Sequence, residues 1–152
     1  MTNNKFTVKL APIRLGEFDM GGVLYHARYF HLLEECRESF FRSISYPYEK
    51  LTKEGFHMPL IKSELNFNAP IRYGDGITGQ ISLEAISKLK LRFIYELFID
   101  PYSESSKPVH RASTTHTFVV AKGDKLTSSR PPDLFYTALK PYMSSTLSDI
   151  NE

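Results

Sequence analysis

One strongly periodic helix constrains what this chain can fold into. Between Ala27 and Ser43, apolar side chains recur at the spacing of a single helix face. The members of this stripe are Tyr29, Leu33, Cys36 and Phe40, with Phe30, Leu32 and Phe41 beside them. The opposite face carries His31, Glu34, Glu35, Arg37, Glu38 and Arg42. A helix of this kind needs a second layer against which to bury its apolar stripe.

Segments that favour β-strands surround this helix. After Pro59 they are LIKSELNFN, ITGQISLEAIS, LKLRFIYELFID and HRASTTHTFVVAK, and one strand is expected before the helix, from Phe6 to Leu10. A brief helix closed at Gly55 is expected in between, and a loop with a short amphipathic piece after Gly123. The order predicts an α+β fold in which an antiparallel sheet of about five strands curls round the helix. We assign residues 1–143 to one domain and 144–152 to a polar tail.

Composition excludes several classes of protein. A chain of 152 residues is most simply one domain, and no apolar run is long enough to span a bilayer. A net charge of +2 is too weak to indicate nucleic acid as a partner. The start of the chain has no apolar stretch typical of a secretory signal, and the single cysteine, Cys36, excludes an internal disulfide framework. We therefore expect a cytoplasmic protein without a membrane span.

A carboxylate and two glycines stand directly before the helix, in the segment FDMGGVLYHARYF. The first turn of a helix presents N–H groups without intrahelical partners, and these can polarise a carbonyl oxygen. Gly21 and Gly22 allow close approach of a ligand, and Asp19 could attack the carbonyl or activate water. This arrangement suits acyl transfer, particularly thioester hydrolysis. The plainer interpretation is that Asp19 caps the helix and that Gly-Gly is a turn.

This segment resembles the hotdog-fold acyl-CoA thioesterases of the 4-hydroxybenzoyl-CoA thioesterase type. The matching positions are Asp19, Gly22, Val23, Tyr25, His26, Tyr29, Glu34 and Arg37. A second segment, APIRYGDGI, is similar to the family's turn between strands, with Pro70, Gly74 and Asp75 in place. The segment GGVLYHARY is most similar to the Tol-Pal-associated thioesterases. The aspartate and the GxVxY pattern are also similar to the 1,4-dihydroxy-2-naphthoyl-CoA hydrolases. Phe18 and Cys36 depart from the family pattern, which puts the substrate in doubt more than the hydrolysis.

The resemblance implies a role for each residue of the candidate site. Asp19 would be the nucleophile or the general base, and the N–H of His26 would polarise the thioester carbonyl. Gly22 would shape the loop, and Tyr25 belongs to the same motif. Glu34 would assist across the cleft, or it would pair with Arg37 or Arg42 on the helix surface.

Three basic residues, Lys88, Lys90 and Arg92, lie on one face at the start of an expected strand. The resemblance implies that they contact the phosphates of coenzyme A, and the alternative is an ordinary solvated strand face. Coenzyme A would be part of the substrate, with no metal or redox cofactor. The family also implies a homodimer or homotetramer with the site at the subunit interface, and pairing would cover a free sheet edge.

Two other functions stay open at this stage. The first is a non-catalytic acyl- or protein-binding hotdog module in which Asp19 is only a helix cap. The second is a hydratase or dehydratase, which would use a histidine with an acid. His110 and His116 are expected to be structural or surface residues. The acyl group is also open, between short aliphatic, hydroxybenzoyl and dihydroxynaphthoyl.

Overall fold

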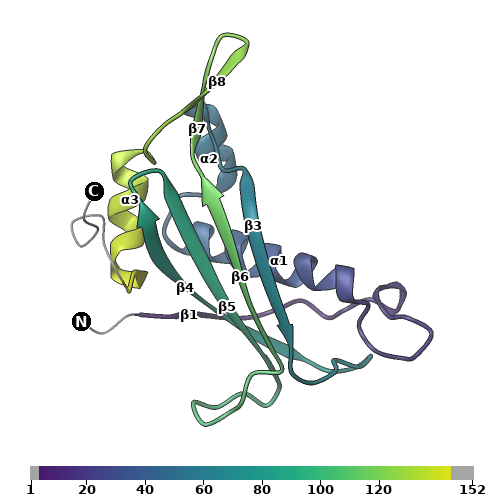
Figure 1. Ribbon diagram of the computed structural model, residues 1–152. Helices are drawn as coiled ribbons and strands as arrows, with labels where there is room; N and C mark the ends of the chain where they lie inside the picture. The colour runs from purple at the N-terminus through teal and green to yellow at the C-terminus, as the bar shows by residue number, and fades with distance from the viewer. Residues whose placement is uncertain (1–3, 145–152) are drawn as a thin grey trace.

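A five-stranded antiparallel sheet curls round one long helix (Figure 1). The structure is a computed structural model and describes residues 4–144. The strands are β1 (Phe6–Lys9), β3 (Leu60–Phe67), β4 (Ile77–Ser87), β5 (Lys90–Ile99) and β6 (His110–Thr117), and the helix is α1 (Tyr29–Ser43). Their order across the sheet is β1-β4-β5-β6-β3, with every neighbouring pair antiparallel. The expected α+β fold is confirmed, and residues 145–152 of the expected tail lie outside the described part.

The expected stripe of α1 forms the centre of the core. Its buried side chains are Tyr29, Leu32, Leu33, Cys36, Phe40 and Phe41. Phe30, which was expected to widen the stripe, is instead exposed. The first turn of the expected helix is a separate 3₁₀ turn, η2 (His26–Arg28), which leads directly into α1. The helix therefore begins at the segment that carries the candidate site.

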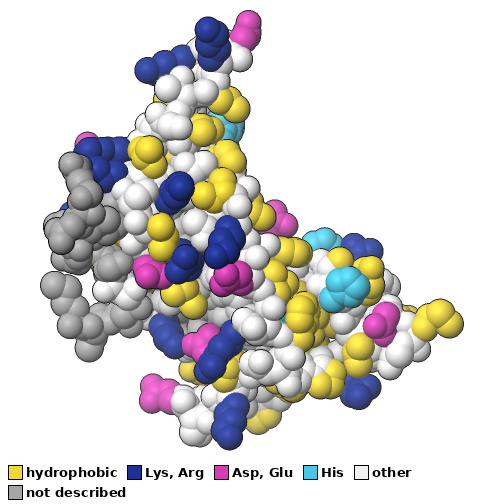
Figure 2. Space-filling view, viewed as in Figure 1, with side chains coloured by type: hydrophobic (Ala, Val, Ile, Leu, Met, Phe, Trp, Pro, Cys, Tyr) yellow, Lys and Arg dark blue, Asp and Glu magenta, His cyan; other side chains and the backbone are white. Residues whose placement is uncertain are grey.

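The sheet presents an apolar face to α1 and a charged face to the outside. Leu91, Phe93, Tyr95 and Leu97 of β5 alternate inward and are buried, which is the period of a strand with one face in the core. The outer face carries ion pairs, among them Glu96 with Lys5 and Arg111, and Arg92 with Glu84. Figure 2 shows opposite charges interspersed over the sheet in this view. The charged residues of the strands therefore lie mainly on the face away from the core.

A second, three-stranded sheet was not predicted. It contains β2 (Phe56–His57), β7 (Val119–Lys122) and β8 (Lys125–Ser128), in the order β2-β7-β8. The sequence run HRASTTHTFVVAK is not one strand, because fully buried Phe118 interrupts it between β6 and β7. The segment after Gly123, expected as a loop, instead returns as β8, and the β7–β8 hairpin projects at the top of Figure 1.

The remaining elements of the described chain are short helices. They are η1 (Leu15–Glu17), α2 (Tyr48–Lys53), α3 (Asp133–Leu139) and η3 (Lys140–Tyr142). The brief helix expected before Gly55 is α2, and Gly55 adopts a φ of 85° just after it. None of the described helices is both long and apolar enough to cross a membrane.

Strand β3 forms an edge of the main sheet and is largely uncovered. Leu60, Ile61 and Phe67 are each about half exposed, and seven of the strand's eight residues are exposed. An edge strand with free N–H and C=O groups and apolar side chains is a surface suited to pairing with another chain.

Arg37 differs from its expected place on the polar face of α1. Its guanidinium is mostly buried and donates to the hydroxyl groups of Tyr48 and Tyr95, the latter at 2.9 Å. Tyr95 in turn bonds to Thr114, and Thr114 bonds to His116 at 3.0 Å. The pattern of α1 could not reveal this inward turn, because the partners come from α2, β5 and β6.

Helix α1 lies very close to the sheet at Gly79 of β4. A Cβ atom placed on Gly79 would overlap the Sγ of Cys36. Burial raises the pKa of the Cys36 thiol to about 12, so this group is a neutral part of the packing. The glycine and the cysteine therefore have complementary sizes.

We expect Gly79→Ala to lower the free energy of unfolding by about 1–3 kcal/mol, because the added methyl group overpacks this contact. Urea denaturation would measure the change. Gly16→Ala is the matched control, since no heavy atom lies within 4 Å of a Cβ there. Cys36→Ala should rescue Gly79→Ala by removing the sulfur, and additive losses in the double variant would contradict this contact.

His110 and His116 give a second prediction. Both are buried rather than at the surface. Burial lowers the pKa of each to about 4, against weaker opposing effects of the Asn66 backbone on His110 and the Met58 backbone on His116. Each imidazole titrates near 6.5 in an unfolded chain, so the unfolded state binds protons first as the pH falls.

The stability contributed by these neutral imidazoles is therefore complete above about pH 6.5 and is lost as the pH falls towards about 4. We expect unfolding free energy, measured in urea, to fall between about pH 6.5 and 5 by on the order of 1.4 kcal/mol per pH unit for each histidine. His110→Phe should halve that slope. A flat profile in the wild type would contradict the prediction.

Candidate active site

A small hairpin carries Asp19 in front of α1. Phe18 and Leu24 form a β-bridge, the N–H of Asp19 donates to the Val23 carbonyl at 2.9 Å, and that of Tyr25 donates to the Glu17 carbonyl at 3.0 Å. The tip is a turn closed by the Gly22 N–H on the Asp19 carbonyl at 3.0 Å. Gly22 has a φ of 78°, which other residues rarely adopt. The glycine therefore has the role of shaping this turn.

The Asp19 carboxylate is exposed and only partly engaged. Its Oδ1 accepts the N–H of Gly21 at 2.8 Å and that of Val23 at 3.4 Å. Among residues 4–144, no hydrogen bond uses its Oδ2. Neither η2 nor α1 has a side-chain cap, so Asp19 does not cap the helix. The helix-cap interpretation is wrong, and Asp19 closes its own turn instead.

The turn η2 offers free N–H groups beside this hairpin. Tyr25 is its N-cap residue, and the Arg28 N–H donates to the Tyr25 carbonyl at 2.8 Å. Within the described part of the chain, the N–H groups of His26 and Ala27 have no acceptor. Tyr25 and His26 are exposed, and their rings contact each other at 4.3 Å. These N–H groups are therefore available to a carbonyl oxygen from outside.

The two sequence motifs lie side by side, although they are far apart in the chain. The Leu24 N–H donates to the Ile71 carbonyl at 2.8 Å, and Val23 forms a bridge with Arg72. The APIRYGDGI segment forms its own turn, in which Asp75 accepts the Arg72 N–H at 2.8 Å. The turn that follows Pro70 thus supports the hairpin of Asp19.

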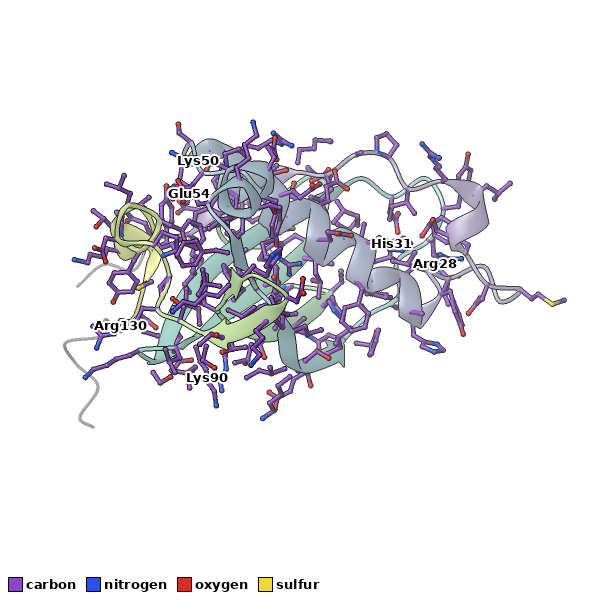
Figure 3. All side chains as sticks on the ribbon, turned by 90° about the horizontal axis from the view of Figure 1, so that it is seen from above. Arg28, His31, Lys50, Glu54, Lys90 and Arg130 are labelled. Atoms are coloured by element: carbon purple, nitrogen blue, oxygen red, sulfur yellow. The ribbon has the colours of Figure 1, made fainter. Side chains whose placement is uncertain are left out.

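An ion-pair cluster that the sequence did not reveal joins the hairpin to α1. Glu17 accepts from the His31 Nδ1 at 3.1 Å and lies 3.8 Å from the Arg28 guanidinium. Glu17 ends η1, Asp19 follows two residues later on the hairpin, and His31 lies on the polar face of α1, so no single periodicity in the sequence connected Glu17 with His31. Figure 3 shows Arg28 and His31 together at one end of the molecule.

Glu34 lies on α1 away from this cluster. Eight residues separate it from His26, which is roughly 12 Å along a helix. The expected ion pair with Arg37 or Arg42 is not formed, because Arg37 bonds to tyrosines and Arg42 pairs with Glu49 at 2.9 Å. Glu34 is exposed, and a single chain does not bring it beside Asp19.

The basic residues lie at the other end of the molecule. Lys88 lies in the turn before β5 rather than in the strand, Lys90 begins β5, and Arg92 pairs with Glu84 at 3.0 Å. Figure 3 places Lys90 and Arg28 at opposite ends. One chain does not bring the basic residues and Asp19 together.

Two open hollows flank the hairpin. One, of about 230 Å³, is lined by Glu17, His31, Glu35 and the Ala11–Arg14 segment, and the other, of about 350 Å³, by Ile13 and the turn from Tyr73 to Gly76. Asp19 and His26 line neither and lie on open surface. Within residues 4–144, no three side chains of His, Cys, Asp or Glu are grouped as metal ligands.

The fold and the two adjoining motifs are those of the hotdog class. Residues 13–138 match the Thioesterase-like superfamily, and the chain therefore belongs to it.

Individual relatives agree with this membership. A 1,4-dihydroxy-2-naphthoyl-CoA hydrolase of Picosynechococcus is 27% identical over 109 residues, which cover 70% of this chain and 75% of the relative. The crystal structure of a 1,4-dihydroxy-2-naphthoyl-CoA thioesterase from Synechocystis has a TM-score of 0.77 at 24% identity, covering 90% of this chain and 96% of that one. The 4-hydroxybenzoyl-CoA thioesterase of a Pseudomonas species has a TM-score of 0.75 at 16% identity, covering 88% and 98%.

Proposed function

We propose that this protein hydrolyses the thioester bond of an acyl- or aroyl-CoA to the free acid and coenzyme A. The observation that carries the proposal is a half-engaged, exposed carboxylate, Asp19, on a hairpin directly before the free N–H groups of His26 and Ala27. A thioester carbonyl on these N–H groups would gain positive character at carbon. Membership of a thioesterase-like superfamily supports this chemistry.

Two routes to thioester hydrolysis are chemically possible at this site. In the first, an Asp19 oxygen attacks the thioester carbon, the coenzyme A thiolate leaves and takes up a proton, and water hydrolyses the resulting anhydride. In the second, Asp19 takes a proton from water as that water attacks the carbon, and the tetrahedral intermediate then expels the coenzyme A thiolate, which takes up the proton from Asp19. Gly22 shapes the turn in both routes, and the exposed side chains of Tyr25 and His26 border the place where the thioester would lie.

We further propose that the working site lies between subunits of a homodimer or homotetramer. Lys88, Lys90 and Arg92 would serve the coenzyme A phosphates of a site at the Asp19 of a second chain, because Lys90 and Arg28 lie at opposite ends of one chain. The free β3 edge, with exposed Ile61 and Phe67, is the surface that favours pairing. Glu34 would act across such an interface. The free, buried thiol of Cys36 is compatible with a cytoplasmic location.

The hydratase or dehydratase alternative has one observation in its favour. The pair of His31 and Glu17, at 3.1 Å, is a histidine with an acid on the same hairpin and helix. Loss of enoyl-CoA absorbance with the purified protein, without thiol release, would favour this second candidate. Release of thiol from a panel of acyl-CoAs, from short aliphatic to hydroxybenzoyl and dihydroxynaphthoyl, would favour hydrolysis and would rule out the non-catalytic binding module.

Asp19→Asn tests the catalytic role. The amide oxygen can still accept the Gly21 N–H, but the charge and most of the basicity are lost, so kcat should fall about a hundredfold or more with KM much less changed. The melting temperature should stay close to that of the wild type, because the turn contact survives.

Asp75→Asn is the matched control for this variant, since Asp75 closes the adjacent turn in the same way. It should keep near wild-type kcat. Equal activity of Asp19→Asn and the wild type on the best acyl-CoA would show that Asp19 has only a structural role.

Complementation tests the shared site. Replacing Lys88, Lys90 and Arg92 together by Ala should raise KM for acyl-CoA and weaken its dependence on salt. Removing three charges elsewhere, Lys53, Lys122 and Lys125, controls for net charge. Co-expression of the triple-alanine chain with Asp19→Asn should restore activity, because a mixed dimer holds one site with both defects and one intact site.

The mixed preparation would be assayed at low substrate concentration, where both parent variants have low hydrolytic activity. Activity no higher than the average of the two parents would contradict the shared site. A monomer in light scattering at micromolar concentration would contradict it as well.

A further inference from the structure

The two arms of the Asp19 hairpin are attached to the rest of the molecule in different ways. The second arm, residues 23–25, is anchored by its main chain, because the Leu24 N–H donates to the Ile71 carbonyl at 2.8 Å. The first arm, residues 17–19, carries the carboxylate. Within the described part of the chain, its main-chain hydrogen bonds go to the hairpin itself and to the turn η1 before it. The position of the first arm therefore depends on side chains.

Two side chains of the first arm reach other elements. Phe18 packs edge-on against Tyr73, with 5.7 Å between the ring centroids. The Glu17 carboxylate reaches α1, where it accepts the Nδ1–H of His31 at 3.1 Å, and it also lies 3.8 Å from the guanidinium of Arg28, the last residue of η2 (Figure 3). An ionised carboxylate only accepts hydrogen bonds, so the Nδ1 of His31 carries the hydrogen in this contact. The first arm is thus held against the second motif by Phe18 and against the helix by Glu17.

An open hollow separates the first arm from α1. This is the hollow of about 230 Å³, and both Glu17 and His31 line it. Glu35 lies one helical turn after His31 and lines it too, but its carboxylate accepts the Ala11 N–H at 2.6 Å rather than a group of the hairpin. Among residues 4–144, the hydrogen bonds and ion pairs that join the first arm to η2 and α1 are those of Glu17. Because the space is open, packing does not replace these contacts.

We propose that Glu17 is a positioning residue, whose carboxylate holds the first arm in the place from which Asp19 acts. This inference rests on the proposed function. The free N–H groups belong to η2, whereas Asp19 belongs to the hairpin, so hydrolysis depends on how these two elements are placed relative to each other. Glu17 is the side chain that connects them, through Arg28 at the end of η2 and His31 on α1. A misplacement of about 1 Å can lower a rate by about a hundredfold, so a contact outside the reacting atoms can limit kcat.

Glu17→Ala removes the contact. We expect kcat on the best acyl-CoA to fall about fivefold to tenfold with KM much less changed, because the thioester still binds at η2 while Asp19 is less often in place. The melting temperature should stay close to that of the wild type, since partly exposed ion pairs contribute little to stability. Glu17→Gln keeps an acceptor oxygen and should restore most of kcat. Glu49→Ala is the matched control, because it breaks another ion pair of α1, with Arg42 at 2.9 Å, and should keep wild-type kcat.

His31 tests the same contact from the side of the helix. The amide nitrogen of an Asn side chain can donate from about the position of Nδ1, whereas Leu has no donor. His31→Asn should therefore keep most of kcat. His31→Leu should lower kcat by no more than Glu17→Ala does, because Arg28 still contacts Glu17. The double variant of Glu17→Ala and His31→Leu should lose no more than Glu17→Ala alone, since both changes remove one shared contact.

Hydrogen exchange provides a readout that needs no hydrolysis. The amides of Asp19 and Gly22 donate within the hairpin, whereas the Leu24 amide donates to Ile71. Glu17→Ala should speed exchange at Asp19 and Gly22 by about fivefold and leave exchange at Leu24 unchanged. A protein that cleaves no thioester fails the proposed function, and this measurement still shows whether Glu17 holds the first arm.

Two results would overturn the inference. The first is a Glu17→Ala variant with either the kcat of the wild type or the wild-type rate of exchange at Asp19 and Gly22. The second is a double variant whose loss of kcat is the product of the losses in Glu17→Ala and His31→Leu, since the two side chains would then act separately.

Discussion

The burial of one face of α1 in the curled sheet is the constraint on which the rest of the structure depends. The two layers come close together where Cys36 meets Gly79, a position without room for a methyl group. This approach fixes the height of the helix above β4. Since η2 continues directly into α1, it also fixes where the free N–H groups of the first turn lie. The packing of the core thus sets the geometry of the proposed site.

The sequence predicted those parts of the fold in which one periodicity dominates. The stripe of α1 and the alternation in β5 are strong because each element buries one face. The break between β6 and β7 was missed because the residues on both sides of Phe118 favour strands equally, and only tertiary packing decides where one sheet ends. Arg37 was misplaced for a similar reason, because its tyrosine partners come from other elements.

For the candidate site, the sequence indicated which residues share the loop before the helix, and it did not indicate their contacts. The motif indicated Asp19, His26 and Gly22, and the structure explains Gly22 by its positive φ. The actual partners of Asp19 could not be read from spacing, because a helix cap and a closed turn place the same residue types in the same order. Lys90 lies far from the loop of Asp19. The sequence could not predict this separation, because it does not show at which end of the sheet β5 begins.

The pairing of Leu24 with Ile71 has a consequence for how this protein folds. The two residues belong to segments separated by all of α1, α2, β2 and β3, so their contact requires the closure of a long stretch of chain. The hairpin of Asp19 cannot reach its native orientation through local contacts alone. A fragment that ends after α1 would contain every residue of the first motif and still lack the surface that orients them. Hydrogen exchange at the Leu24 amide would accordingly report on the long-range assembly of the domain rather than on the local turn.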